Sequence, residues 1–371
     1  MKKKIIFVSV TNDLTYDQRV HKVCLSLIEM GFNVLLIGRI LPNSKEIDRA
    51  YPVKRFKLLF NSGFLFYASY NIRLFVFLLF NKVDILHSND LDTLFANWLI
   101  SKIRRKKIVY DSHEYFTGVP EIQDRPLVKK IWEKIEQLIF PKLENVFTVN
   151  QSIADIYKEK YKVEVKVLRN LPLKSKVKKM QTKESLKLPF NREIIILQGT
   201  GINIDRGAEE LLEAVAISED LFLCIVGSGD VIDLLKRRSE SLDLKDKVLF
   251  TGKLNYQDMM QYTMNSSVGL SLDKDTNINY RLSLPNKIFD YVKAGIPVVC
   301  SNLIEVSNVV NQFQIGLITP SHNPYDILNT INEVLEKNKQ DQYLPNLNKA
   351  LEVLNWENEV KVLSNTYSNI E

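Results

Sequence analysis

Short apolar runs alternate with helix-period segments along the first half of the chain. The segments 17–30 and 128–140 place apolar residues three and four positions apart, which is the spacing of one helix face. The runs between such segments are too short for helices and consist mostly of aliphatic residues, so they predict buried strands. They are residues 5–10, 34–37, 83–87, 108–110, 146–149 and 165–168. Strands that alternate with helices indicate a parallel sheet, and therefore the α/β class.

The same pattern starts again in the second half. Predicted strands cover residues 193–197, 222–226, 248–251, 268–272 and 298–300, and predicted helices cover 208–216, 285–294 and 356–367. A polar, Lys-rich stretch at 173–187 separates the halves and is expected to be a linker. We therefore predict an N-terminal domain of residues 1–172, completed by the C-terminal helix 356–371, and a second domain of residues 188–355.

Length and composition agree with two globular domains. The 371 residues are 45% apolar and 25% charged, which is ordinary for a globular protein. The three cysteines, Cys24, Cys224 and Cys300, are odd in number, far apart and in apolar surroundings, so buried reduced thiols are expected. The start, Met1-Lys2-Lys3-Lys4 and then a strand, lacks the apolar core of a signal peptide. These features favour a cytoplasmic protein.

The net charge of +6 is unevenly distributed. Residues 1–180 contain 32 Lys/Arg and 18 Asp/Glu, a net +14, whereas the remainder has 18 and 26, a net −8. The basic half could be a solvated surface, or it could face an anionic membrane surface or acceptor. Nucleic acid is not an expected partner, because no helix-turn-helix, RNP or zinc-finger pattern accompanies the charge.

Residues 64–80 form the most apolar run of the chain. The run is marginal in length for a membrane-spanning helix and contains Asn71 and Arg73 near its middle. A buried helix or a helix on the membrane surface fits it better. A membrane surface also fits the basic cluster Arg104-Arg105-Lys106-Lys107, so attachment to the inner face of the plasma membrane is an expectation.

The most informative chemistry lies in the stretch 282–301, which reads L-S-L-P-N-K-I-F-D-Y-V-K-A-G-I-P-V-V-C-S. Pro285 fits the first turn of a helix, and Gly295 followed by Pro297 ends that helix. A loop would therefore open onto free backbone N–H groups, which attract phosphate. Asp290, about one turn into the helix, could accept hydrogen bonds from two sugar hydroxyls. The alternative is an ordinary loop–helix–strand unit.

This stretch resembles the nucleotide-sugar site of retaining glycosyltransferases of family 4, which have the GT-B fold. In many of them two Glu residues eight positions apart run through this loop and helix, and the second binds the ribose. Asp290 occupies the second position, but the first is Leu282, so half of the motif is missing. The form S-L-P-N-K-I-F-D-Y resembles a branch with P-N-K and F-E-Y. The resemblance implies donor contacts from Ser283, Leu284, Pro285, Asn286 and Lys287.

Three further loops of the second half resemble the donor side of this family. The family's Arg and, six residues later, Lys that neutralise the diphosphate correspond here to Thr200 and Arg206. Arg206 can serve, since a guanidinium binds phosphate in a bidentate manner. The remaining implied donor contacts are Gly199, Gly227 in a V-G-x-G-like turn, and Lys253 and Leu254 beside the base.

Two stretches of the first half resemble the acceptor side. N-D-L-T-Y-D-Q-R-V, residues 12–20, is similar to a form seen in the same branch, and it implies acceptor contacts from Asn12, Asp13, Asp17 and Arg19. The alternative is a helix start with favourable acids. His113 follows a predicted strand, as does the family's His near the reacting sugar, and the alternative is a local hydrogen-bond network.

The resemblance covers nearly the whole chain and implies two Rossmann-like domains facing across a cleft, with the C-terminal helix returning to the first. It implies a hexosyl-type retaining transfer, in polysaccharide biosynthesis, from a nucleotide-diphosphate sugar to a glycan or lipid-linked glycan hydroxyl. Arg206 with Lys287 would stabilise the leaving diphosphate, Asp290 would hold the ribose, and His113 would be catalytic. The D-L-D at 90–92 and D-K-D at 273–275 match a metal motif, but chance explains both, so no metal or other cofactor is expected.

Two other functions stay open. A nucleotide-sugar epimerase of the same fold would need cleft carboxylates and histidines that the sequence does not locate. A non-catalytic glycosyltransferase-like subunit would explain Leu282 and Thr200 at positions where the family has functional residues.

Overall fold

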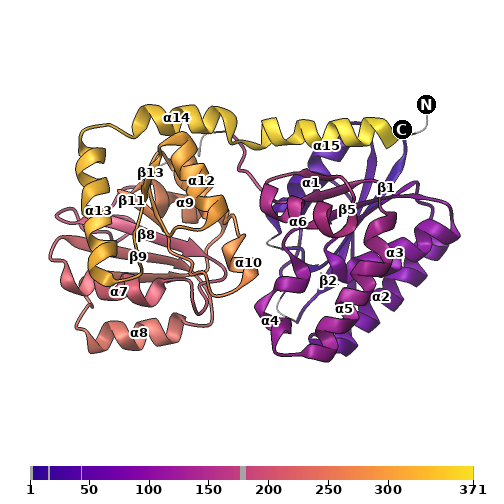
Figure 1. Ribbon diagram of the computed structural model, residues 1–371, viewed down its shortest axis with the longest axis horizontal. Coiled ribbons are helices and arrows are strands. Elements are labelled where there is room, and N and C mark those ends of the chain that lie inside the picture. Colours follow the sequence, from indigo (N-terminus) through magenta and orange to yellow (C-terminus); the bar gives the residue numbers. More distant parts are fainter. Residues whose placement is uncertain (1–2, 16, 43, 176–180, 371) are drawn as a thin grey trace. The chain divides into compact units, whose positions relative to one another are not determined.

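A computed structural model describes residues 3–15, 17–42, 44–175 and 181–370 of the chain. The chain divides into one compact unit, Met1–Asn170 with Glu359–Glu371, and a second unit, Leu171–Asn358 (Figure 1). Part of the predicted linker, residues 176–180, lies outside the described residues. Leu186, also in that stretch, is buried in the core of the second unit.

The first unit is built on a seven-stranded sheet in the order β3-β2-β1-β4-β5-β6-β7, in which each neighbouring pair is parallel. Strands of such a sheet are covered on both faces, which is why they read as short apolar runs. Its strands are β1 (Ile5–Asp13), β2 (Asn33–Ile40), β3 (Val53–Lys57), β4 (Ile85–Asn89), β5 (Lys107–Ser112), β6 (Val146–Thr148) and β7 (Val165–Val167).

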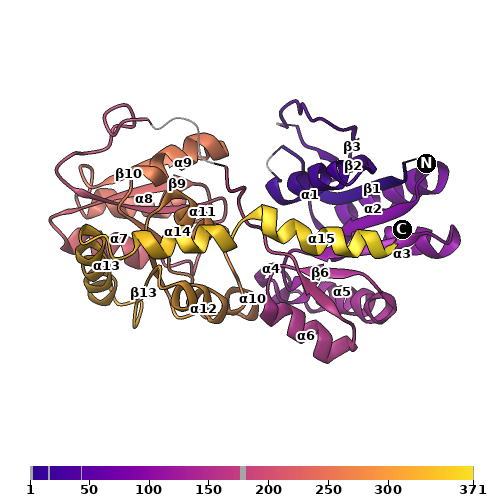
Figure 2. The ribbon, with the colours of Figure 1, turned by 90° about the horizontal axis from the view of Figure 1, so that it is seen from above.

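Helices pack on this sheet. They are α1 (Gln18–Glu29), α2 (Gly63–Phe80), α3 (Leu91–Ile103), α4 (Pro120–Gln123), α5 (Pro126–Ile139), α6 (Gln151–Tyr161) and α15 (Trp356–Ile370), with 3-10 turns at Phe116–Gly118 and Phe140–Lys142. The C-terminal helix α15 runs along the unit in Figure 2, and its fully buried Tyr367 packs edge-on against Phe32. Among the helices that the structure describes, α2 is long and apolar enough to cross a membrane by length and composition alone.

The second unit is built on a six-stranded sheet in the order β10-β9-β8-β11-β12-β13, again parallel throughout. Its strands are β8 (Glu193–Gly199), β9 (Leu221–Gly227), β10 (Val248–Gly252), β11 (Val268–Ser271), β12 (Val298–Cys300) and β13 (Gly316–Ile318). Its helices are α7 (Ala208–Ile217), α8 (Ile232–Ser241), α9 (Tyr256–Met264), α10 (Ile278–Arg281), α11 (Lys287–Ala294), α12 (Ile304–Phe313), α13 (Pro324–Lys339) and α14 (Leu344–Val353).

The α/β class with two Rossmann-like domains is confirmed, and the three cysteines are buried and free. Two local predictions were wrong. Strand β1 continues to Asp13, where a polar loop was expected from residue 11, because Thr11 is buried against α3. Helix α11 begins at Lys287 with Asn286 as its N-cap, so Pro285 precedes the helix, and the short helix α10 before it was missed.

Strand order reverses between β1 and β4 in the first sheet, and between β8 and β11 in the second. In open parallel sheets, ligands bind beyond the carboxyl ends of the strands at such reversal points. These two places are therefore where each unit should present its chemistry.

Candidate functional site

At the reversal point of the second sheet, a buried carboxylate lies between two cations. Asp273, two residues beyond β11, is 1% exposed. Its Oδ2 lies 2.9 Å from Nη1 of Arg206, and its Oδ1 lies 3.9 Å from Nζ of Lys287. The Arg206 guanidinium also stacks 4.3 Å over the Tyr280 ring. A buried carboxylate without such partners would be costly, so Asp273 fixes both cations at this strand end.

The loop that carries Arg206 is held against the segment after β11. The backbone N–H of Lys274 donates to the carbonyl of Asp205 across 2.8 Å. Gly207 has φ +71°, and a Cβ there would lie 2.2 Å from the carbonyl oxygen of Leu272. Only glycine permits this approach. The sequence therefore positions Arg206 through backbone packing as well as through its ion pair.

Lys287 opens helix α11, and its side chain is 11% exposed. Burial lowers the pKa of Lys287, although Asp273 acts in the opposite direction. Within the part of the chain that the structure describes, the backbone N–H groups of Leu284, Asn286 and Lys287 donate no hydrogen bond. A cation and free N–H groups at a helix start form an environment suited to phosphate.

Asp290 lies in the first turn of α11 and is 8% exposed. Its Oδ1 accepts a hydrogen bond from the Tyr256 hydroxyl at 2.9 Å, and its Oδ2 accepts one from Nε2 of Gln198 at 3.2 Å. Burial, followed by the neighbouring Asp290 carboxylate, raises the pKa of Tyr256, which therefore keeps its proton as a donor. The two donors fix the carboxylate in one orientation, and ribose binding by Asp290 stays a prediction.

The other predicted donor contacts lie at the same carboxyl edge. The turn after β9 packs on the end of β8: the Ser228 N–H donates to the Gly199 carbonyl at 3.1 Å. Gly227 and Gly199 touch through their backbones, and a Cβ on Gly227 would overlap the Gly199 carbonyl oxygen. The other residues predicted here are half-buried Ser283, Leu284, Pro285 and Leu254, and exposed Thr200, Lys253 and Asn286.

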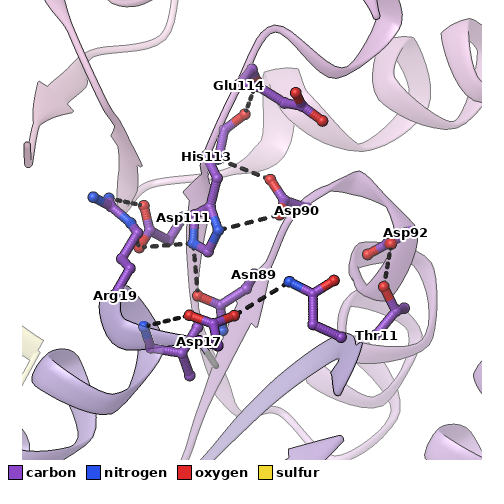
Figure 3. Close-up of polar contacts among 12 residues, drawn as sticks. Thr11, Asp17, Arg19, Asn89, Asp90, Asp92, Asp111, His113 and Glu114 are labelled. Carbon is purple, nitrogen blue, oxygen red and sulfur yellow. Dashed lines mark hydrogen bonds and ion pairs between the residues drawn. The ribbon is translucent and has the colours of Figure 1, made fainter. Parts of the chain in front are cut away.

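In the first unit, His113 lies among acidic and amide side chains (Figure 3). Its Nδ1 is 3.3 Å from Oδ2 of Asp90, and its Nε2 is 3.5 Å from Oδ2 of Asp111 and 3.1 Å from Oδ1 of Asn89. Burial opposes protonation, but the Asp90 and Asp111 carboxylates outweigh it and raise the pKa of His113 to about 9. At neutral pH the side chain is an imidazolium, so it donates hydrogen bonds and is not a general base.

Arg19, a predicted acceptor contact, is buried within the first unit. It is 4% exposed, and its Nε and Nη2 donate to the two carboxylate oxygens of Asp111 at 3.1 and 2.6 Å. Nη1 donates to the Leu168 carbonyl at 2.8 Å. Position 19 lies on the face of α1 that packs inward, and its acceptor contact stays a prediction. All three guanidinium nitrogens are engaged within the domain.

Asp17 is the N-cap of α1: its Oδ1 accepts from the Val20 N–H at 3.0 Å, and its Oδ2 accepts from Asn12. The alternative of a helix start with a favourable acid therefore holds for Asp17. Asp13 accepts hydrogen bonds from Ser44 at 2.6 Å and from Thr15. Burial would raise the pKa of Asp13, but these hydrogen bonds lower it overall. Asn12 is exposed.

Several polar residues at the two edges were not predicted as site residues: Asn89, Asp90, Asp92, Asp111, Gln198, Tyr256 and Asp273. Asp90, Asp92 and Asp273 were noted only as parts of D-x-D patterns attributed to chance. Asp92 is buried, and its Oδ2 accepts a hydrogen bond from Oγ1 of Thr11 at 2.5 Å. Burial, followed by the nearby Asp90 carboxylate, raises the pKa of Asp92 to about 8. Their position in the sequence could have indicated two of these residues, because Asp111 and Asp273 each follow a predicted strand directly. Over the described ranges, no group of three or more His, Cys, Asp or Glu side chains is arranged to hold a metal ion.

Comparison with known proteins relates both halves of the chain to glycosyltransferases. The family described as "Glycosyltransferase Family 4" matches residues 18–170, and "Glycosyl transferases group 1" matches residues 179–350. A search of curated proteins found no match. The first half of the chain is therefore similar to the family 4 model and the second half to the group 1 model.

Solved structures show the same fold. Sucrose-phosphate synthase from Thermosynechococcus elongatus is 16% identical, with a TM-score of 0.77 and 99% of each chain covered. A glycosyltransferase from Rickettsia africae is also 16% identical, with a TM-score of 0.77, covering 100% of this chain and 99% of that one. Anabaena HepE in complex with UDP-glucose is 16% identical, with a TM-score of 0.74 and 99% and 100% coverage. The fold is therefore GT-B.

Proposed function

We propose that the protein is a retaining glycosyltransferase that moves a sugar from a nucleotide-diphosphate sugar to a hydroxyl of a glycan or lipid-linked glycan. The arrangement of Arg206, Asp273 and Lys287 at the reversal point of the second sheet is the observation on which the proposal depends. Two cations share one carboxylate there, so a net positive charge remains for an anion. HepE was solved with UDP-glucose, which supports a uridine nucleotide as the first donor to test.

In the proposed reaction, the bond between the anomeric carbon and the diphosphate oxygen breaks, the acceptor oxygen takes its place, and the proton of the acceptor hydroxyl passes to the leaving diphosphate. Negative charge grows on the leaving diphosphate. Arg206, Lys287 and the N–H groups at the start of α11 would stabilise that charge, an effect that grows in a water-poor site. Asp290 would accept hydrogen bonds from the ribose, and the His113 imidazolium would donate to the transferred sugar or the acceptor.

Calorimetric titration with UDP tests the donor site. Arg206→Ala should weaken binding by about 1.5–3 kcal/mol, the usual range for hydrogen bonds to a charged group. Arg281→Ala is the matched control, because Arg281 belongs to the same unit but pairs with Asp275 in a 57% exposed position. Asp273→Asn should bind UDP at least as tightly as wild type, since it removes the competing carboxylate. Unchanged affinity in Arg206→Ala would refute the assignment.

Incubation with UDP-glucose and other nucleotide-diphosphate sugars tests for catalysis. Slow release of free sugar, with retained anomeric configuration, is expected for a retaining transferase. Tight nucleotide binding without any turnover would favour the non-catalytic subunit, and conversion of the donor to its epimer would favour the epimerase.

A further inference from the structure

Helix α2 is apolar on the face that points away from the protein. Its inner side chains, Phe66, Tyr70, Leu74 and Leu78, are buried in a core cluster of the first unit. Its outer side chains include Leu65, Ile72, Val76 and Phe80, which are 52%, 65%, 48% and 79% exposed. Successive members are seven, four and four residues apart, so they lie in one stripe along the helix. A surface helix in water normally has a polar outer face, so this stripe needs a non-aqueous neighbour.

The C-terminal end of α2 is tied to the C-terminal end of α3. The Arg104 guanidinium, directly after α3, donates to the carbonyls of Leu78 and Asn81 at the end of α2. Ile103, the last residue of α3, is 59% exposed and adds to the apolar surface there. In Figure 1 the two helices lie side by side, so their ends form one continuous edge of the unit.

A lysine-lined cavity opens at this edge. Its volume is about 320 Å³, and it lies at the amino ends of β1, β4 and β5. Its lining consists of Lys3, Lys4, Lys82, Lys107, Asp84, Ile5, Ile85 and Ile370. The acids at this edge are partly neutralised already: Asp84 lies 3.6 Å from Lys106, and Glu144 lies 3.4 Å from Lys107. With Arg104 and Arg105 beside it, the cavity retains an excess of positive charge.

We propose that this edge binds the surface of an anionic phospholipid bilayer, with the outer stripe of α2 in the interfacial region and a lipid phosphate in the lysine cavity. Charge complementarity favours an anionic bilayer over a protein partner, because an apolar stripe that binds a protein does not require four lysines at its end. Each basic residue near an anionic leaflet contributes about 1 kcal/mol, so the cluster is sufficient for reversible attachment. The buried inner face of α2 makes it a helix that lies on the membrane rather than one that crosses it.

The proposal goes beyond the glycosyltransferase reaction. It agrees with the cytoplasmic membrane face expected from the sequence. Binding to vesicles needs neither donor nor acceptor, so it can fail while the proposed activity stands, and the reverse also holds.

Co-sedimentation of the full chain with phosphatidylglycerol and phosphatidylcholine vesicles tests the proposal. Wild type should bind phosphatidylglycerol at low salt at least about tenfold better than phosphatidylcholine, and high salt should release it, because salt screens exposed charges. Two double variants separate the lysines from the apolar stripe: Lys82→Gln/Lys107→Gln and Val76→Ser/Phe80→Ser. Each should reduce vesicle binding about tenfold, the decrease expected when one or two interfacial contributions are lost.

The matched controls lie in the second unit. Lys236→Gln/Arg237→Gln removes two exposed charges of α8, and Leu234→Ser/Ile304→Ser removes two side chains that are each 49% exposed. Both should bind vesicles as wild type does. No binding to anionic vesicles at low salt, or equal binding by all variants, would overturn the proposal. A lipid-free dimer that only Val76→Ser/Phe80→Ser dissociates would instead identify the stripe as a contact between copies, and would also overturn it.

Discussion

Arg19 of α1 and Asp111 of β5 form a two-point ion pair in which neither side chain is more than 5% exposed. The same carboxylate lies 3.5 Å from His113 and 4.0 Å from His87. His87 in turn shares a 2.6 Å hydrogen bond with the hydroxyl of Tyr367 on α15. Burial alone would raise the pKa of Asp111, but Arg19 and His113 hold it well below its usual range. One carboxylate therefore joins four elements around the predicted catalytic histidine.

Arg19→Met should destabilise the first unit strongly. The variant leaves Asp111 as a buried carboxylate without its main partner, and breaking such a pair costs about 3–5 kcal/mol. Urea unfolding, followed by circular dichroism, measures the change. Lys107→Met is the control, because its pair with Glu144 is 59% and 75% exposed, and such pairs contribute about 0–1 kcal/mol. A stable Arg19→Met variant that lost only turnover would support the predicted acceptor contact.

Gly227→Ala should destabilise the second unit, whereas Gly201→Ala should not. Gly227 has φ +140°, and an added Cβ would lie 1.7 Å from the Gly199 carbonyl oxygen, so the ends of β8 and β9 would have to separate. A Cβ on Gly201, in the neighbouring loop, meets nothing within 4 Å. The difference should exceed about 2 kcal/mol, because the substitution combines strain at positive φ with a backbone clash. Equal unfolding midpoints would show that the turn adapts freely.

Asp290→Asn should weaken uridine and UDP to a similar degree, by about tenfold or more, because a ribose hydroxyl would lose a charged acceptor. Competition calorimetry with the two ligands measures this. Tyr256→Phe is the control: it removes the 2.9 Å hydrogen bond to Asp290 and keeps the carboxylate, so it should bind both ligands nearly as well as wild type. A loss confined to UDP would place Asp290 near the diphosphate and not near the ribose.

The sequence predicted most of the strands, because parallel strands covered on both faces must be short and apolar. It missed β3 and β13, two edge strands that are only partly buried. It also predicted the strand-end positions of His113 and Arg206. It could not predict their partners, since Asp273 is 67 residues from Arg206 and Asp111 is 92 residues from Arg19. A pattern of polarity shows that a charged residue follows a strand or begins a helix. Which opposite charge it meets depends on strand order, and therefore on the folded sheet.

The stability of the first unit should depend on pH through His113. Its pKa is about 9 in the folded protein and 6.5 when unperturbed, so folding favours the protonated form. This contribution is fully present below about pH 6.5 and is lost as pH rises through about 9. It is on the order of 3 kcal/mol, since each pH unit between the two values corresponds to about 1.4 kcal/mol. His113→Gln should remove this loss from urea unfolding measured across the range, and an unchanged slope would contradict the ion pairs with Asp90 and Asp111.

His113→Gln should also reduce turnover without changing donor affinity. The imidazolium is in the first unit, at the carboxyl end of β5, whereas the predicted diphosphate contacts are all in the second. Loss of one charged hydrogen-bond donor to the transferred sugar or the acceptor should lower kcat by about 10–150-fold, which corresponds to about 1.5–3 kcal/mol. If the protonated form is the active one, wild-type kcat should fall above about pH 9, and the variant should lack this alkaline decline. Measurement of kcat against pH, together with the Kd for UDP, separates the two effects.

His21→Gln is the control for that experiment. His21 is in the same unit but hydrogen-bonds Tyr51 at 2.7 Å, and burial lowers its pKa to about 4. It is therefore neutral in the working range, and its replacement should leave both kcat and the pH profile unchanged. Wild-type turnover in His113→Gln would show that the histidine serves only to hold β4 and β5 together through Asn89, Asp90 and Asp111. A parallel loss of UDP affinity would instead mean that His113 contacts the nucleotide itself, which would require a different assignment of the donor side.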